Sequence, residues 1–191
     1  MTSSLISRRT LAIRLAVLPL GVGAAVRFVR ASADASEPPG TGSDGLSHAT
    51  ESIHQEVTFQ AAPGQVYAAL TSARRFDALT RLSDAATLVT APNAKATTIS
   101  REVGGAFVLF GGYITGRHLE MVPGERLVQA WRAGSWPAGD YSVVKFALAA
   151  QDSGCRLIFD HGGFPEGQGA SLAYGWRVHY WEPLAKLLAQ R

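Results

Sequence analysis

HGGFPEGQGASLAYGWRVHYWEPLAKLL, residues 161–188, is the stretch that decides the fold. Its second part carries large apolar side chains at spacings of four and three residues, which place them on one stripe of an α-helix. The stripe consists of Leu172, Trp176, Tyr180, Leu184 and Leu187. Together with Trp181 it holds too much ring surface for a helix in water, so we expect the helix to lie across a β-sheet.

The residues upstream of this helix build the sheet. Short runs of β-forming residues are separated by Gly and Pro turns, a spacing typical of antiparallel meanders. We expect strands at 53–59, 97–103, 106–110, 113–122, 127–132, 141–149 and 155–161. Two short helices, one with Pro63 in its first turn and one capped by Ser72, follow the first strand. The predicted class is α+β, with a curved antiparallel sheet wrapped around a long C-terminal helix.

The charge of the chain is concentrated in its first 33 residues. The whole chain has 18 Lys and Arg residues against 15 Asp and Glu residues. Five arginines and no acidic residue lie in residues 1–33, which leaves 13 basic and 15 acidic residues in the remainder. The remainder therefore lacks the positive charge that nucleic acids and anionic membranes attract. We expect no nucleic-acid partner, and contact with a membrane only through the leader during export.

Residues 1–33 have the features of an export leader. Arg8 and Arg9 form a twin-arginine pair, an apolar run follows at 15–26, and Ala33 ends a small-x-small cleavage site. We predict a twin-arginine signal cleaved after Ala33 and a periplasmic protein. Two alternatives are a permanent anchor and an ordinary secretory signal. The 12-residue run is shorter than the roughly 20 residues that span a membrane, and further arginines in and after it weaken an ordinary signal.

The rest of the chain divides into a linker and one domain. Residues 34–50 are small, polar and turn-forming, which indicates a flexible linker with no core to bury. The domain is expected at 51–191, and a chain of this length can bury an adequate core. Cys155 is the only cysteine, so no disulfide can form within the chain. We interpret it as a small buried apolar residue.

Several motifs resemble one known family. The ranges 105–132 and 136–188 are similar to the activator-of-heat-shock-ATPase homologue-like family of the START/SRPBCC, polyketide cyclase-like superfamily. The similar pieces are Pro123-x-x-Arg126-Leu127-Val128, Trp131-Arg132, Trp136-Pro137, His161-x-Gly163-x-Pro165 and Gly175-Trp176-x-x-His179-Tyr180-Trp181-x-Pro183-Leu184. With Ala62-Pro63 near the start of the domain, the resemblance covers nearly all of residues 53–189.

The resemblance implies a helix-grip fold with an apolar cavity under the long helix. It does not imply a single activity, because the superfamily includes lipid carriers, cyclases and stress proteins. The co-chaperone that gives the family its name has a separate N-terminal module with no counterpart in this sequence. We therefore expect this chain, as an exported protein, not to act as that co-chaperone.

Six residues are predicted to line the cavity and bind the ligand. They are Phe107, Trp131, Tyr141, His161, Trp176 and Tyr180. His161 would orient the ligand, since histidine exchanges protons near neutral pH. The alternative is that the aromatic residues are ordinary core and turn packing and that His161 is a structural residue bonded to a loop carbonyl.

Four other polar residues carry groups that can bind a metal ion. His179 and Glu182, with His118 and Glu120, contain metal-ligating groups, but nothing in the sequence brings them together. We expect no metal and no cofactor, and we assign no catalytic residue. Pro183 lies inside the predicted helix and should bend it by removing a hydrogen bond to the carbonyl of His179. Such a bend follows sheet curvature or widens the cavity.

Three functions fit this sequence. The first is an exported single-domain protein that binds a small hydrophobic or amphipathic ligand, driven by burial of apolar surface. The second is a cyclase-like or hydrolase-like enzyme that uses the same cavity and needs a convergent acid–base pair. The third is a protein-interaction module without a ligand, which needs a filled core and an exposed apolar patch.

Overall fold

The computed structural model of the chain describes residues 50–190. The predicted leader at 1–33, and the predicted linker at 34–50 except its last residue, lie outside the described residues. Both therefore stay predictions. Within the described range, no helix has the length and apolar character needed to span a membrane.

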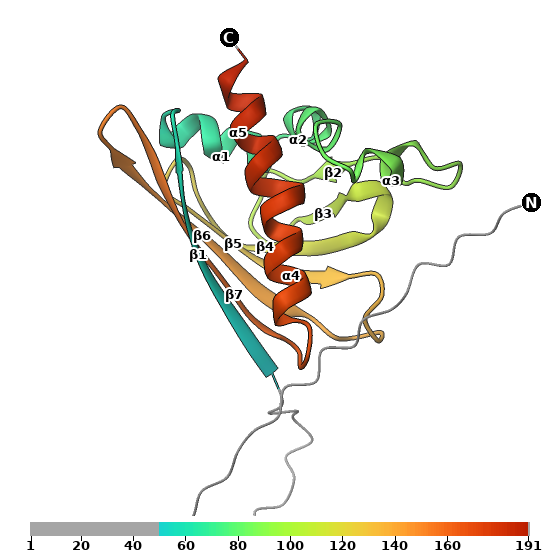
Figure 1. The fold of residues 1–191 in the computed structure, drawn as a ribbon. Coiled ribbons are helices and arrows are strands. Elements are labelled where there is room, and N and C mark those ends of the chain that lie inside the picture. Colours follow the sequence, from blue (N-terminus) through green and yellow to red (C-terminus); the bar gives the residue numbers. More distant parts are fainter. Residues whose placement is uncertain (1–49, 191) are drawn as a thin grey trace, which may run out of the picture. The chain divides into compact units, whose positions relative to one another are not determined.

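A seven-stranded antiparallel sheet forms the frame of the domain, in the order β1-β7-β6-β5-β4-β3-β2. The strands are β1 (Thr50–Phe59), β2 (Thr98–Ile99), β3 (Ala106–Leu109), β4 (Ile114–Val122), β5 (Arg126–Ala133), β6 (Ser142–Gln151) and β7 (Gly154–Pro165). Strands β2 to β7 form a meander, and β1 pairs with β7 along its whole length. Figure 1 shows the sheet curving around the C-terminal helix. The predicted helix-grip class is confirmed.

Three short helices follow β1. They are α1 (Pro63–Thr71), α2 (Ala73–Thr80) and α3 (Ala86–Thr90). Pro63 stands in the first turn of α1, as predicted, where its missing N–H costs no hydrogen bond. Ser72 precedes α2, but its side chain makes no capping hydrogen bond. The sequence did not predict α3, because its five residues bury no side chain of their own and show no helical period.

The long C-terminal helix has three parts. It consists of α4 (Gly169–Trp176), a π-helical segment η2 (Arg177–Trp181) and α5 (Glu182–Ala189). In η2 the hydrogen bonds reach back five residues, as from the N–H of Glu182 to the carbonyl of Arg177. Pro183, which has no N–H to donate, follows directly in the first turn of α5. A π turn therefore stands just before Pro183, while the bend that we expect at this proline stays a prediction.

Two predicted hairpins differ from the structure. The strand expected at 97–103 is reduced to Thr98–Ile99, because the N–H of Glu102 bonds the hydroxyl of Ser100 in a local turn. A short 3-10 turn η1 (Phe110–Gly112) replaces the expected two-residue turn between β3 and β4. Gly111 has φ +68°, and a Cβ there would lie 2.2 Å from the carbonyl oxygen of Leu88 in α3. The absence of a side chain at Gly111 permits α3 to pack this closely against η1.

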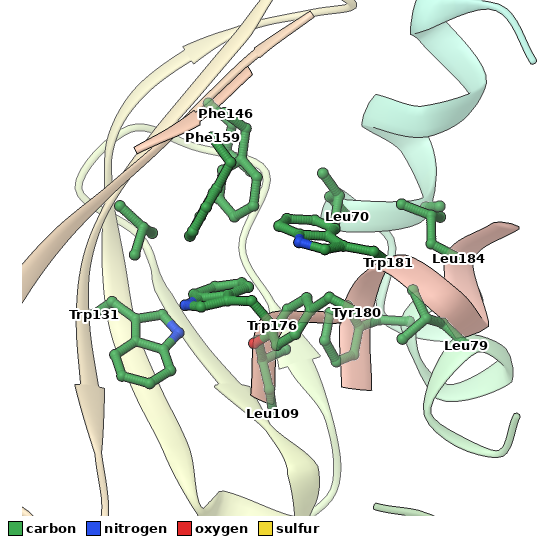
Figure 2. Packing of buried hydrophobic residues seen from close by; sticks show 14 of the residues in the cluster. Leu70, Leu79, Leu109, Trp131, Phe146, Phe159, Trp176, Tyr180, Trp181 and Leu184 are labelled. Carbon is green, nitrogen blue, oxygen red and sulfur yellow. The ribbon is translucent and has the colours of Figure 1, made fainter. Parts of the chain in front are cut away.

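The core lies between the sheet and the C-terminal helix. Figure 2 shows the rings of Trp176 and Trp181 facing Phe146 and Phe159 of the sheet. The ring centroids of Phe159 and Trp176 are 4.3 Å apart. Of the predicted stripe, Trp176, Tyr180 and Leu184 are buried, while Leu172 and Leu187 are partly buried. Aromatic residues of this size dominate core energetics, so the C-terminal helix is held on the sheet mainly by the packing of its aromatic side chains.

Candidate functional site

A cavity of about 430 Å³ lies between the C-terminal helix and the sheet. Its size falls within the range of small-molecule sites. Its walls come from α3, η1, β4, β5, the loop after β5, and α4 with η2. The lining residues are Ala85, Leu88, Phe110, Tyr113, Ile114, Trp131, Ala133, Ser135, Gln168, Ser171, Leu172, Gly175, Trp176, His179 and Tyr180.

The cavity runs from the surface into the core. At one end lie Leu88 and Tyr113, which are 41% and 45% exposed. At the other end lie Trp131, Trp176 and Tyr180, which are all buried. The outer end is polar, since the hydroxyls of Tyr113 and Ser135 are hydrogen-bonded there. The inner end is a pocket of aromatic rings, so the site suits a molecule with a large apolar part.

Strand alternation places the sheet side chains of this site. Along β5 every second residue is buried, which turns Trp131 and Ala133 inward while Ala130 and Arg132 face outward. Trp131 packs edge-on against Trp136 at 5.3 Å between centroids. The indole N–H of Trp136 in turn donates to the side-chain oxygen of Gln168 at 2.6 Å. This bond ties the loop after β5 to the start of α4 at the mouth of the cavity.

Three polar atoms on the cavity wall have no hydrogen-bond partner. They are Trp131 Nε1, the Tyr180 hydroxyl and His179 Nδ1, and each is shielded from water. Burial raises the pKa of the Tyr180 hydroxyl, and the Trp131 indole N–H, which lies within hydrogen-bonding reach of the hydroxyl, lowers that pKa by a smaller amount. The Tyr180 hydroxyl therefore keeps its proton and is a hydrogen-bond donor. Among residues 50–190, no Lys, Arg, Asp or Glu lines the cavity.

His161 is buried beside the cavity but does not line it. Its Nδ1 accepts the indole N–H of Trp176 at 3.0 Å, so the proton must sit on Nε2. The Nε2 lies 2.7 Å from the hydroxyl of Ser142, which itself donates to the carbonyl of Trp131. Both ring nitrogens are thus occupied. Burial lowers the pKa of His161 to about 3, which keeps the ring neutral.

Of the six predicted ligand-binding residues, Trp131, Trp176 and Tyr180 line the cavity. Phe107 lies deeper in the sheet, over Gly116, where a Cβ would come within 2.3 Å of its ring. Tyr141 is 54% exposed, because it stands just before β6 and outside the sheet pairing. The geometry thus supports the structural alternative for His161, although its partners are a serine and an indole instead of a loop carbonyl.

The sequence missed several lining residues. Phe110 and Leu88 are brought to the cavity by η1 and α3, two elements that the sequence did not predict. Phe110 packs edge-on against Tyr180 with centroids 5.2 Å apart. His179 was weighed only as a metal ligand, although it stands next to Tyr180 in the most conspicuous motif of the chain. The position of Phe110 directly before a Gly-Gly turn was the one feature of the sequence that could have indicated its place on the cavity wall.

The metal-ligating residues that we weighed do not converge. Glu182 pairs with Arg177 on the exposed side of the helix at 3.3 Å, whereas His179 lines the cavity. Strand alternation turns His118 into the core with Ile114 and Gly116. The bulge that follows in β4 breaks this alternation, and Glu120 pairs with Arg126 instead of facing inward beside His118. Among residues 50–190, no group of three or more His, Cys, Asp or Glu is placed to hold a metal ion. Cys155 is buried, as predicted.

The chain matches the model of one protein family. The model is described as activator of Hsp90 ATPase homolog 1-like protein and covers residues 60–189. The human activator of 90 kDa heat shock protein ATPase homolog 1 is 25% identical over 138 residues, 72% of this chain and 37% of the human protein. A Schizosaccharomyces pombe protein is 29% identical over 76% of this chain and 40% of its own length. The chain thus spans less than half of these relatives.

Solved structures share the fold. The crystal structure of an HSP90 activator from Plasmodium falciparum has a TM-score of 0.58 at 23% identity, and the match covers 73% of this chain and 95% of that one. The crystal structure of CalU16 from Micromonospora echinospora has a TM-score of 0.55 at 21% identity, over 74% of this chain and 78% of that one. At this identity the likeness establishes the helix-grip fold and nothing about ligands.

Proposed function

The chain belongs to the activator of Hsp90 ATPase homolog 1-like family, and on that premise we propose that it binds a small, largely apolar molecule in the cavity under its C-terminal helix. The observation that carries the proposal is the cavity itself. A space of about 430 Å³ remains between the C-terminal helix and the sheet, open to the surface at one end and lined by aromatic rings at the other, and clefts of this size are typical of small-molecule sites. A ligand would bury that apolar surface at a gain of about 25 cal/mol per Å² before ordering costs.

Binding is favoured over catalysis by the chemistry of the wall. An enzyme of the cyclase or hydrolase type needs an acid–base pair aimed at the substrate. His179 is the one histidine on the lining, and within the described range no carboxylate stands beside it there. His161, the other histidine of this region, is occupied on both nitrogens and held neutral. The polar atoms in the cavity suit recognition of a ligand.

We also propose that the protein works outside the cytoplasm. The support is the sequence alone: the Arg8-Arg9 pair, the apolar run at 15–26 and the cleavage site ending at Ala33. The human relative is named as an activator of a heat shock protein ATPase, and that activity belongs to that protein. Export would separate this chain from a cytosolic chaperone.

Titration with the neutral fluorophore N-phenyl-1-naphthylamine tests the binding proposal. We expect saturable binding of one dye molecule, with quenching of tryptophan emission as Trp131 and Trp176 transfer energy to it. Replacing Ala133, whose side chain faces the cavity, by Leu should weaken this binding. Ala130→Leu is the matched control, because Ala130 faces outward from the same strand. Equal binding by the two variants would place the dye elsewhere and count against the proposal.

A further inference from the structure

We infer that the ligand is uncharged and carries a hydrogen-bond-accepting oxygen of the carbonyl type, held at the inner end of the cavity by Trp131 and Tyr180. This inference rests on the proposed binding function and names the chemistry of its ligand. It starts from two unpartnered donors. Trp131 Nε1 can only donate, and the Tyr180 hydroxyl keeps its proton, so both offer an N–H or O–H to the same region.

The two donors converge. Figure 2 shows the indole nitrogen of Trp131 and the hydroxyl of Tyr180 turned toward one another beside the ring of Trp176. The Trp131 indole lies within hydrogen-bonding reach of the Tyr180 hydroxyl and lowers the pKa that burial raises, but the two groups do not meet in the geometry of a formed hydrogen bond, so both remain without a partner. An oxygen atom with two lone pairs can accept from both groups at once. A carbonyl oxygen has that capacity, whereas a hydrocarbon has none.

The surroundings make these unpartnered donors costly. Trp131 is 3% exposed and Tyr180 is 5% exposed, so water does not compensate for the missing hydrogen bonds. A buried donor without an acceptor is rare in folded proteins and destabilises the state in which it occurs. By contrast, the indole N–H groups of Trp136, Trp176 and Trp181 are all paired. Trp131 is therefore the exception among the four tryptophans.

The charge of the ligand follows from the rest of the wall. In the part of the chain that the structure describes, the lining offers no Lys or Arg to pair with an anion and no Asp or Glu to pair with a cation. Burying an ion without a partner is far more costly than burying a neutral polar group. The ring-lined floor of Phe110, Trp176 and Tyr180 also suits a flat unsaturated ligand. The class that fits is a neutral, mainly aromatic or polyene molecule with a ketone, ester or amide oxygen.

A matched pair of probes tests this assignment: 2-acetylnaphthalene and 2-isopropenylnaphthalene, which share shape but differ in the carbonyl oxygen. Calorimetric titration should show the ketone binding about three- to tenfold tighter, as expected for one or two neutral hydrogen bonds. Tyr180→Phe should reduce that preference without lowering thermal stability, because the removed hydroxyl has no partner. Tyr174→Phe, at an exposed residue outside the cavity, should keep the preference.

The infrared C=O stretch of the bound ketone supplies a readout that needs no variant. It should move to lower frequency on binding, and less so in Tyr180→Phe. If both probes bind equally and the stretch stays at its value in hydrocarbon solvent, the inference is overturned while the binding function stands. If neither probe binds, the proposed function and this inference fall together.

Discussion

The indole rings of Trp176 and Trp181 stack with their centroids 5.6 Å apart and their planes 20° from parallel. Residues five apart in a regular α-helix point about 140° away from each other, since each residue turns about 100°. The π turn at Arg177–Trp181 adds one residue to the turn and brings both rings to the same side. Tyr180 and Trp181 are consequently both buried, and the helix presents a wider aromatic face than its sequence period suggests.

The Trp181 ring is also tied to the edge strand β1. Its N–H donates to the side-chain oxygen of Gln55 at 2.6 Å, and the nitrogen of Gln55 donates to the carbonyl of Ala173 at 3.0 Å. Gln55→Ala should lower the free energy of unfolding by about 1–3 kcal/mol, because it leaves the buried indole N–H unpaired. Urea denaturation measures this. Gln151→Ala, at an exposed strand end, is the control, and equal losses in the two variants would contradict the role of Gln55.

The free energy of unfolding should decrease as the pH is lowered below about 6.5. Burial lowers the folded-state pKa of His161 to about 3, so the unfolded chain, with a histidine pKa near 6.5, binds the proton first. The contribution of neutral His161 to the free energy of unfolding is complete above about pH 6.5. It is lost as the pH falls from 6.5 to about 3, at up to about 1.4 kcal/mol per pH unit. His118, whose pKa is also lowered by burial, adds to the slope.

Urea denaturation at a series of pH values measures this dependence. His161→Gln should flatten it, since a neutral amide can accept from Trp176 and donate to Ser142 without titrating. An unchanged slope in that variant would mean that His161 is not the group responsible.

Cys155 should resist thiol reagents in the folded protein. Its side chain is buried, and burial raises the pKa of the thiol, which lowers the fraction of reactive thiolate. We expect Ellman's reagent to react with about one thiol per chain in urea and far more slowly in native buffer. Rapid native labelling would show that the strand pair β1–β7, which encloses Cys155, opens readily.

The export proposal predicts a defined mature end. In a bacterium with the twin-arginine pathway, the mature protein should begin at Asp34, which mass spectrometry of the periplasmic fraction can read. Replacing both Arg8 and Arg9 by Lys should leave the precursor in the cytoplasm. Equal export of that variant would point instead to the general secretory route.

The sequence predicted the sheet and the burial of the helix because both depend on local period. Inward residues of β5 such as Trp131, and the helix residues Trp176 and Tyr180, follow periods of two and about 3.6. The π turn escaped notice because one inserted residue breaks the period without an apolar gap. Pro183 was its only sign.

The cavity could not be predicted from the hydrophobic pattern of the sequence alone. Its outer wall depends on α3, which packs against η1 where Gly111 comes close to Leu88, a contact between segments with no shared period. His161 could not be assigned from sequence either. Its partners, Ser142 and Trp176, come from β6 and α4, and only their positions show that both ring nitrogens are engaged.

Native mass spectrometry of the protein, purified without denaturation from its own host, tests the central claim most directly. The account predicts a retained, uncharged small molecule in a fraction of the wild-type protein and its loss in Ala133→Leu, with Ala130→Leu like the wild type. Gas-phase release and fragmentation would then identify its oxygen-bearing group. A bare polypeptide mass for all three proteins, with no mass added by extracts of the host, would contradict the claim that the cavity carries a ligand.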